Sequence, residues 1–125
     1  MNLTPLASQV ETYMDLVSIR QKLVASNIAN AATPGYKTRD IDFQFEFQSA
    51  LDDLAGHAHG GSQDAPEVNV YEPDTLKAHN DGNNVNLDRE ARLLSENAIR
   101  FNFATQVWKS QMRQVRSAIQ EGRNG

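Results

Sequence analysis

The C-terminal third of the chain carries an uninterrupted heptad repeat, and this repeat limits the folds open to the sequence more than any other feature. Small or apolar side chains recur at steps of four and three residues from residue 87 to residue 119. One heptad position holds only large residues, namely Leu87, Leu94, Phe101, Trp108 and Val115. The other position holds Ala91, Ala98, Thr105, Met112 and Ile119. A repeat of this length is typical of a long packed helix, so we expect a helix from about residue 88 to residue 120.

Residues at both ends of the repeat suit the two ends of the same helix. Asn86 or Asp88 can cap its first turn, and the carboxylates of Asp88 and Glu90 suit the positive end of a helix dipole. Gly122 suits a helix stop. These signals bound the expected helix on both sides.

The N-terminal segment carries a shorter form of the same repeat. Thr4 suits a helix cap and Pro5 suits the first helical position, which predicts a helix from about residue 5 to residue 31. Arg20 and Asn27 interrupt its apolar seam, which consists of Leu3, Leu6, Val10, Tyr13, Val17 and Val24. We expect the two terminal helices to run antiparallel and to pair along their seams. The predicted fold is therefore mainly α, with a coiled-coil-like helix pair and a middle segment that is irregular or contains short β-strands.

The middle of the chain differs from both ends in charge and in pattern. Residues 39–87 contain ten acidic and two basic side chains, whereas the flanking segments are near neutral or basic. Residues 40–47 alternate as a strand would, but Phe43, Phe47, Leu51 and Leu54 also form a helical stripe, so both interpretations stay open. Residues 67–72 alternate again and predict a short strand. The sequence thus divides into an N-terminal helix and turn (1–35), a middle segment (36–86) and a C-terminal helix (87–125).

Composition argues against several functional classes. The chain has no cysteine and no apolar run long enough to span a membrane, and its N-terminus lacks the pattern of a cleaved signal peptide. Its basic residues are too sparse to predict nucleic-acid binding. His57 and His59 lie in a glycine-rich stretch, but no further ligand cluster accompanies them, and the sequence contains no nucleophile elbow or phosphate loop. We therefore expect neither an enzyme nor a bound metal or cofactor.

The residues that follow the N-terminal helix predict a fixed change of chain direction. Asn27 and Asn30 can hydrogen-bond the free backbone groups at a helix end. The sequence Thr33-Pro34-Gly35-Tyr36 suits a type II turn, which needs a positive φ at its third residue. The segment therefore ends the helix and redirects the chain, and a second turn is expected at residues 81–84.

Two stretches of the sequence resemble the family of flagellar rod and hook axial proteins. The stretch ASNIANAATPGYKTRDIDF, residues 25–43, is similar to the N-terminal signature of that family. The stretch DGNNVNLDRE, residues 81–90, is similar to the segment that leads into the C-terminal helix of the proximal rod members. Ala32 departs from the signature, which commonly has an acidic residue there. By this resemblance, the turn motif consists of Ser26, Asn27, Ile28, Ala29, Asn30, Thr33, Pro34, Gly35 and Tyr36.

The resemblance implies a structural subunit of the proximal rod in the basal body of the bacterial flagellum. Such a subunit polymerises through its terminal helices into a helical assembly, links the membrane ring and export gate to the rest of the rod, and transmits torque for motility. The implied partners are copies of the same chain, other flagellar rod proteins, membrane-ring and basal adaptor proteins, and the type III export gate. Export from the cytoplasm to the periplasmic rod would then need no cleaved signal peptide.

Two helices alone cannot bury every apolar position in the two repeats, so further partners are expected. The residues expected to pack between subunits are Leu6, Val10, Tyr13, Val17, Val24, Leu87, Leu94, Phe101, Trp108, Met112, Val115 and Ile119. An alternative function is that of a soluble homodimeric coiled-coil adaptor, which would use the same seams without forming a polymer.

Overall fold

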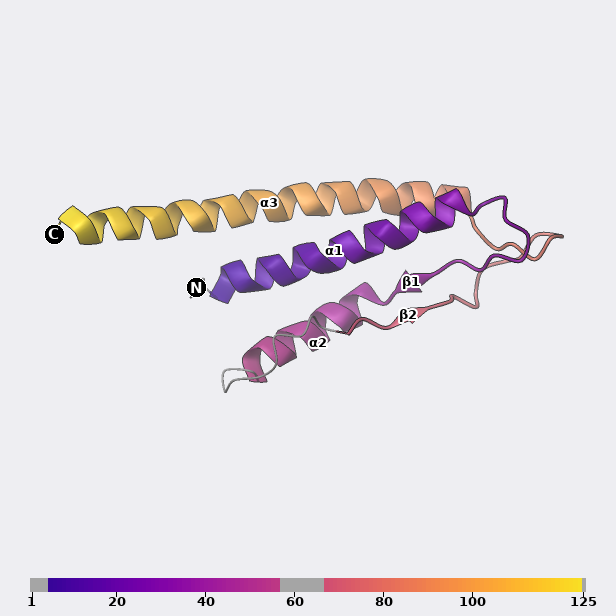
Figure 1. Ribbon diagram of the computed structural model, residues 1–125, viewed down its shortest axis with the longest axis horizontal. Helices are drawn as coiled ribbons and strands as arrows, with labels where there is room; N and C mark the ends of the chain where they lie inside the picture. The colour runs from indigo at the N-terminus through magenta and orange to yellow at the C-terminus, as the bar shows by residue number, and fades with distance from the viewer. Residues whose placement is uncertain (1–4, 57–66, 125) are drawn as a thin grey trace.

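Two long antiparallel helices form the body of the molecule, and a shorter helix lies beside them (Figure 1). The computed structural model describes residues 5–56 and 67–124. The elements are α1 (Pro5–Ala29), β1 (Asp40–Ile41), α2 (Phe43–Gly56), β2 (Val70–Tyr71) and α3 (Leu87–Asn124). The predicted mainly α fold with paired terminal helices is confirmed.

The ends of the helices follow the capping signals in the sequence. Pro5 is the first residue of α1, as expected, while Thr4 lies outside the described residues. At the start of α3, the Asn86 side-chain Oδ1 accepts a hydrogen bond from the Arg89 backbone N–H at 3.1 Å, which makes Asn86 the cap. Asp42 caps α2 in the same way, because its Oδ1 accepts the Phe45 N–H at 3.2 Å.

The core lies mainly between α1 and α3, with a smaller contribution from the middle segment. Polar contacts fix the register of the two helices: the Asn97 Nδ2 donates to the Gln21 Oε1 at 3.0 Å, and the Trp108 Nε1 donates to the Glu11 Oε1 at 3.2 Å. Because residue numbers rise on one helix as they fall on the other, these two pairs establish the antiparallel direction. The buried apolar residues of the two helices are Ala7, Leu16, Val17, Val24, Leu93 and Ala104.

The face of α3 that meets α1 differs from the predicted seam. Glu90, Leu93, Asn97 and Ala104 are buried and point inward. Most of the large residues of the predicted seam are half-buried or exposed, and Leu87 and Ile119 are 55% and 58% exposed. The expected pairing along this seam is therefore wrong for the first half of α3, whereas Trp108, further along the seam, contacts Glu11 of α1. The inward face was hidden from a search for apolar periodicity because two of its members are polar.

The start of the middle segment was predicted as either a strand or a helix, and it forms the helix α2. Phe43 and Phe47 pack edge-to-face against Tyr13 of α1, with ring centroids 5.3 Å and 5.5 Å from the Tyr13 ring. The Arg100 guanidinium of α3 lies over the Phe43 ring, 5.4 Å from its centroid. These contacts hold α2 against one flank of the α1–α3 pair.

A two-stranded antiparallel sheet closes the middle segment beside α1. Asp40 of β1 is paired with Tyr71 of β2, and Ile41 with Val70. The short strand predicted over residues 67–72 is thus present at its centre, Val70–Tyr71. Within the described parts of the chain, none of the helices has the length and apolarity needed to cross a membrane.

Candidate functional site at the exit of α1

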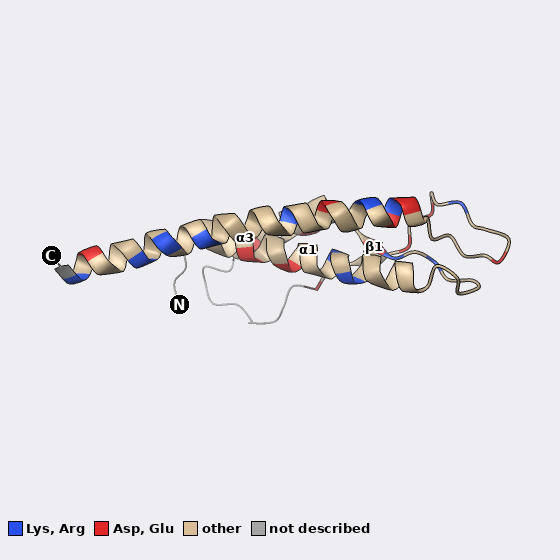
Figure 2. Ribbon diagram, turned by 90° about the horizontal axis from the view of Figure 1, so that it is seen from above, with Lys and Arg blue, Asp and Glu red and all other residues tan. Residues whose placement is uncertain are grey.

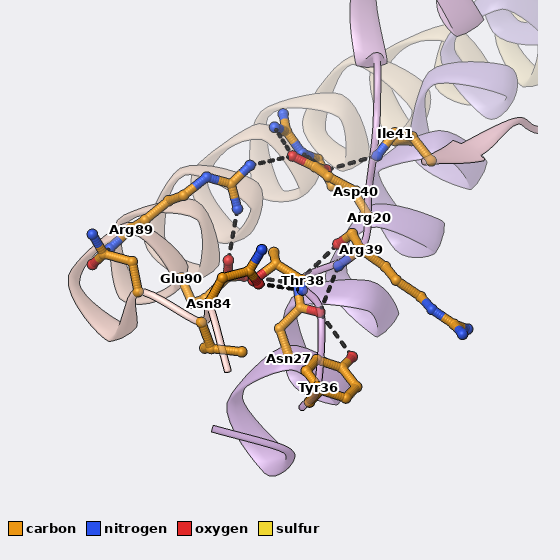
Figure 3. Close-up of polar contacts among 12 residues, drawn as sticks. Arg20, Asn27, Tyr36, Thr38, Arg39, Asp40, Ile41, Asn84, Arg89 and Glu90 are labelled. Atoms are coloured by element: carbon orange, nitrogen blue, oxygen red, sulfur yellow. Dashed lines mark hydrogen bonds and ion pairs between the residues drawn. The ribbon is translucent and has the colours of Figure 1, made fainter. Parts of the chain in front are cut away.

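Asn27 occupies the centre of a buried polar site at the end of α1 (Figure 3). Its side chain is almost fully buried, with 1% of its surface exposed. Its Nδ2 donates to the Arg39 carbonyl at 2.9 Å and to the Glu90 Oε2 at 3.2 Å. Its Oδ1 accepts from the Arg39 N–H and from the Tyr36 hydroxyl, each at 3.0 Å. A carboxamide offers two donor hydrogens and two acceptor lone pairs, so Asn27 uses its full hydrogen-bonding capacity.

The predicted turn follows directly after this asparagine. The Tyr36 N–H donates to the Thr33 carbonyl at 3.2 Å, which closes the four-residue turn. Gly35 has a φ of 76°, as the third position of a type II turn requires. The turn returns the chain toward α1, which brings the Tyr36 hydroxyl to Asn27.

The remaining residues of the turn motif support the helix end. The Asn30 Nδ2 donates to the Ser26 carbonyl at 2.8 Å, and the Thr33 Oγ1 donates to the Asn30 Oδ1 at 3.2 Å. The Ser26 hydroxyl lies 3.4 Å from the Tyr36 hydroxyl. Ile28 and Ala29 are exposed and take no part in these hydrogen bonds.

A second asparagine, Asn83, fastens the segment before α3 onto this turn. Its Nδ2 donates to the carbonyls of Asn30 and Thr33, at 2.9 Å and 2.8 Å. Its Oδ1 accepts the Val85 N–H at 2.8 Å. Asn83 therefore joins two stretches of chain that lie about fifty positions apart in the sequence.

The turn at residues 81–84 contacts the first turn through its backbone as well. The Gly35 N–H donates to the Asp81 carbonyl at 2.9 Å. Gly82 has a φ of 84°, and a Cβ placed on it would lie 3.5 Å from the Gly35 Cα. Beside them, the Thr38 N–H donates to the Asn84 Oδ1 at 2.7 Å. The two expected turns thus form one joint.

A cluster of four charged side chains extends the site along the helices. The carboxylate of Asp40, in β1, accepts hydrogen bonds from the Nε and one terminal nitrogen of Arg20, each at 3.0 Å. It also accepts one from a terminal nitrogen of Arg89 at 2.5 Å. The other terminal nitrogen of Arg89 contacts the Glu90 Oε1 at 2.6 Å. Two cations and two anions balance, and Glu90 links the cluster to Asn27. The cluster joins α1, β1 and α3.

The charge states of this cluster follow from its geometry. Burial opposes ionisation of Asp40, but hydrogen bonds from Arg20, the Ile41 N–H and Arg89 outweigh burial and hold the pKa of Asp40 below its usual value of 3.8. Burial also opposes the charge on Arg89, yet Asp40 and Glu90 outweigh it and raise the pKa of Arg89. Both partners are therefore charged at neutral pH, as a salt bridge requires.

The site combines residues that the sequence pointed to with residues that it did not. Arg20 appeared only as an interruption of an apolar seam, whereas Asn27 was also predicted to bond the helix end and to belong to the turn motif. Both are polar contacts of the site, with Asn27 buried and Arg20 partly buried. Asp40, Arg89 and Glu90 were not assigned to a site, because nothing in the local pattern shows that they meet.

The side chains of this site hold backbone segments together. Its polar side chains contact one another and the backbone of three segments. Among the described residues, no group of three or more His, Cys, Asp or Glu side chains is arranged to hold a metal ion. His57 and His59 lie outside the described residues.

The residues expected to pack between subunits occupy several environments in the single chain. Val17 and Val24 are buried against the rest of the chain, and Val10, Tyr13, Trp108, Met112 and Val115 are half-buried. The exposed members are Leu6, Leu87, Leu94, Phe101 and Ile119. Two residues outside this set, Ile99 and Phe103, are the most exposed large apolar residues of α3, at 69% and 70%.

Comparison with known proteins places this site in context. Residues 14–37, which include Asn27 and the first turn, match a family model described as flagella basal body rod protein. The chain is 30% identical over 122 residues to the flagellar basal body rod protein FlgB of Salmonella typhimurium, an alignment that covers 87% of this chain and 88% of the relative. It is also 30% identical to FlgB of Yersinia enterocolitica, over 87% of this chain and 89% of the relative. FlgB of Escherichia coli is 27% identical, with coverage of 87% and 88%.

Proposed function

Because this chain belongs to the family of flagellar basal body rod proteins, we propose that it is a subunit of the proximal rod that polymerises through α1 and α3. The family is one of structural rod proteins and not of enzymes. In this role the chain links the membrane ring and export gate to the rest of the rod, and its helices transmit torque along the rod axis.

The observation that carries the proposal is the set of large apolar side chains left exposed on α3. Ile99 and Phe103 are more than two-thirds exposed, and Phe101 is 40% exposed. A contiguous exposed apolar surface typically marks an interaction site. Phe101 lies about 160° around the helix from Phe103, because successive residues turn by about 100°. The helix therefore presents apolar groups on more than one side, as a subunit with several neighbours needs.

The buried site at the exit of α1 supports the same role. A rod subunit under torque has to keep its two terminal helices in a fixed relation to each other. The contacts of Asn27 and Asn83 and the ion pairs of Asp40 join both helices to the segment between them. A joint of this kind passes force from one helix to the other without relying on the apolar core alone.

The proposed location and partners follow from the role. The subunit is exported from the cytoplasm through the type III export gate without cleavage of a signal peptide, and it is built into the periplasmic rod. There it contacts copies of itself, other rod proteins, and the membrane-ring and basal adaptor proteins. The homodimeric adaptor is the competing function, and it predicts a closed pair of chains in place of a polymer.

The proposal is tested by replacing the exposed apolar residues in the source bacterium. A strain deleted for the gene receives the wild-type chain, a variant with Ile99→Glu and Phe103→Glu, or a control variant with Gln120→Glu, at an exposed position remote from both residues on α3. We expect wild-type and control chains to be recovered in purified basal bodies and to restore swimming. The apolar-face variant should keep the helical circular dichroism of the wild type and fail in both assays.

Two results would contradict the proposal. The first is absence of the wild-type chain from purified basal bodies. The second is a stable dimer in sedimentation that forms equally well in the apolar-face variant and accounts for all of the chain in cells, which would favour the adaptor function.

A further inference from the structure

A groove between α1 and α3 remains open on the flank that lies away from α2. Its cavity has a volume of about 470 Å³. Small side chains, Ser18, Ala25 and Ala98, form much of its wall. The remaining lining residues are Val17, Gln21, Lys22, Asn97, Phe101 and Asn102. We call this feature the α1–α3 groove.

Asn97, in the lining of the groove, has an unsatisfied hydrogen-bond acceptor. Its side chain is 1% exposed, and its Nδ2 donates to Gln21. Its Oδ1 is buried and has no hydrogen-bond partner among the described residues. Buried polar groups are nearly always paired in folded proteins. The Asn97 Oδ1 is an exception to this rule, and the atoms around it cover it.

Helix α2 presents a face with the complementary features. Phe45, Gln48 and Asp52 are all exposed, and Phe45 is 60% exposed. Their spacing of three and four residues places them on one side of the helix. The three side chains supply an aromatic group, an amide donor and a carboxylate, in that order along one line.

Charge also matches between the groove and this face of α2. Lys22 is the charged residue in the groove lining, and it makes no ion pair within the described part of the chain. Helix α2 contains Glu46, Asp52 and Asp53 and no Lys or Arg. The acidic helix and this lysine can therefore attract each other. Figure 2 shows further basic residues along the C-terminal half of α3.

The groove and α2 lie on opposite sides of α1. Tyr13 receives the α2 aromatic rings, whereas Lys22 lines the groove. These two residues are nine positions apart, which is about two and a half turns of a helix. Their side chains consequently project in opposite directions. A chain cannot place its own α2 in its own groove, but it can offer α2 to a second copy.

Building on the proposed rod function, we infer that the α1–α3 groove of one subunit receives the Phe45–Gln48–Asp52 face of α2 from a second copy of this chain. Phe45 enters the groove, and Asp52 pairs with Lys22. Because donor and acceptor surfaces differ, the contact is heterologous, so each subunit can engage one neighbour on either side. The contact therefore extends an array of subunits without closing it as a dimer.

The inference is tested by cysteine cross-linking in assembled basal bodies, since the chain has no cysteine of its own. Cells express Gln48→Cys and Ala98→Cys on separate copies of the chain, and the basal bodies are oxidised before denaturing electrophoresis. We expect a disulfide-linked pair of chains only when both variants are present. Gln48→Cys combined with Gln114→Cys, which lies about 160° around α3 from Ala98, should give none. Linkage of either single variant to itself, linkage of Ala98→Cys to a different protein, or no linkage in intact rods would overturn the inference.

A charge exchange provides a second test with a different readout. Lys22→Glu or Asp52→Lys alone should lower incorporation of the chain into basal bodies about fivefold, as loss of about 1 kcal/mol at a contact implies. The double variant should recover most of this loss. If the single variants are incorporated at the wild-type level, the α2 contact is refuted, while recovery of the chain in basal bodies leaves the rod function standing.

Discussion

Asn27 and Glu90 stand 63 positions apart in the sequence and meet in the interior, where the Asn27 Nδ2 donates to the Glu90 Oε2 at 3.2 Å. The contact joins the last turn of α1 to the first turn of α3. Glu90 is completely buried, so its charge depends on this amide and on Arg89 for compensation. The pair therefore sets where the second long helix begins relative to the end of the first.

Replacing Asn27 should destabilise the joint strongly. Asn27→Ala leaves the Arg39 N–H and one oxygen of Glu90 without this partner, and an unpaired buried polar group costs about 1–3 kcal/mol. We expect the free energy of unfolding in urea to fall by about 2–3 kcal/mol. Gln120→Ala, at an exposed position of α3, is the control and should change it little. An Asn27→Ala variant as stable as the wild type would show that water replaces these contacts without cost.

Removing the charge of Asp40 should be about as damaging. Asp40→Asn leaves Arg20 and Arg89 without the carboxylate between them, and breaking one partner of a buried ion pair costs about 3 kcal/mol. The matched control is Glu96→Gln, which removes the exposed ion pair of Glu96 with Arg92. That pair is worth less than about 1 kcal/mol. Urea unfolding of the two variants should therefore separate them clearly, and equal losses would rule out a special role for the buried cluster.

Lowering the pH should reduce the free energy of unfolding, because the Asp40 carboxylate becomes protonated. The pKa of Asp40 is held below 3.8 in the folded chain. Its stabilising contribution is thus present above the unfolded value near 3.8 and is lost as pH falls through the lower folded value. The pKa of Asp15 is raised by burial and by Glu11. Asp15 therefore changes the free energy of unfolding with pH in the opposite direction, and it does so in every variant.

The measurement for this effect is the difference in unfolding free energy between the wild type and Asp40→Asn as a function of pH. The contribution of Asp15 cancels in that difference. We expect the difference to be constant from pH 7 to about pH 5 and to shrink below pH 4. A difference that stays constant down to pH 2 would mean that Asp40 does not titrate with the fold.

The first turn should tolerate only residues that accept a positive φ. Gly35→Ala should cost about 1–2 kcal/mol, because an L-residue with a side chain is strained at a φ of 76°. Gly35→Asn should cost less, since asparagine enters this region more readily. Gly56→Ala, at the end of α2, is the control, because a Cβ has free space at both glycines but only Gly35 has a positive φ. Thermal unfolding midpoints in the order wild type, Gly35→Asn, Gly35→Ala would support this, and equal midpoints would contradict it.

The two long helices were predictable because their signals are local. Heptad spacing, Pro5 at the first helical position and the cap at Asn86 predict helices close to the observed α1 (Pro5–Ala29) and α3 (Leu87–Asn124). The existence of the turn was predictable for the same reason, since Pro34 and Gly35 are adjacent.

The register of the helix pair was not predictable, because it depends on residues distant in sequence. Glu90 and Asn97 face inward only because Asn27 and Gln21 meet them there. Read from α3 alone, both look like solvent-exposed positions, and the apolar repeat beside them is the stronger local signal. The helical form of residues 43–56 likewise depends on Tyr13, which receives the two phenylalanine rings.

The back-to-back contact of Gly35 and Gly82 has a consequence for how such chains vary in length. Because the two turns are fastened together, the stretch between them begins and ends at nearly the same place. Residues can be inserted or removed within that stretch without shifting α1 along α3, and each doubling of such a closed segment costs only about 0.6 kcal/mol of entropy. The middle segment can therefore gain residues while the arrangement of α1 and α3 stays the same.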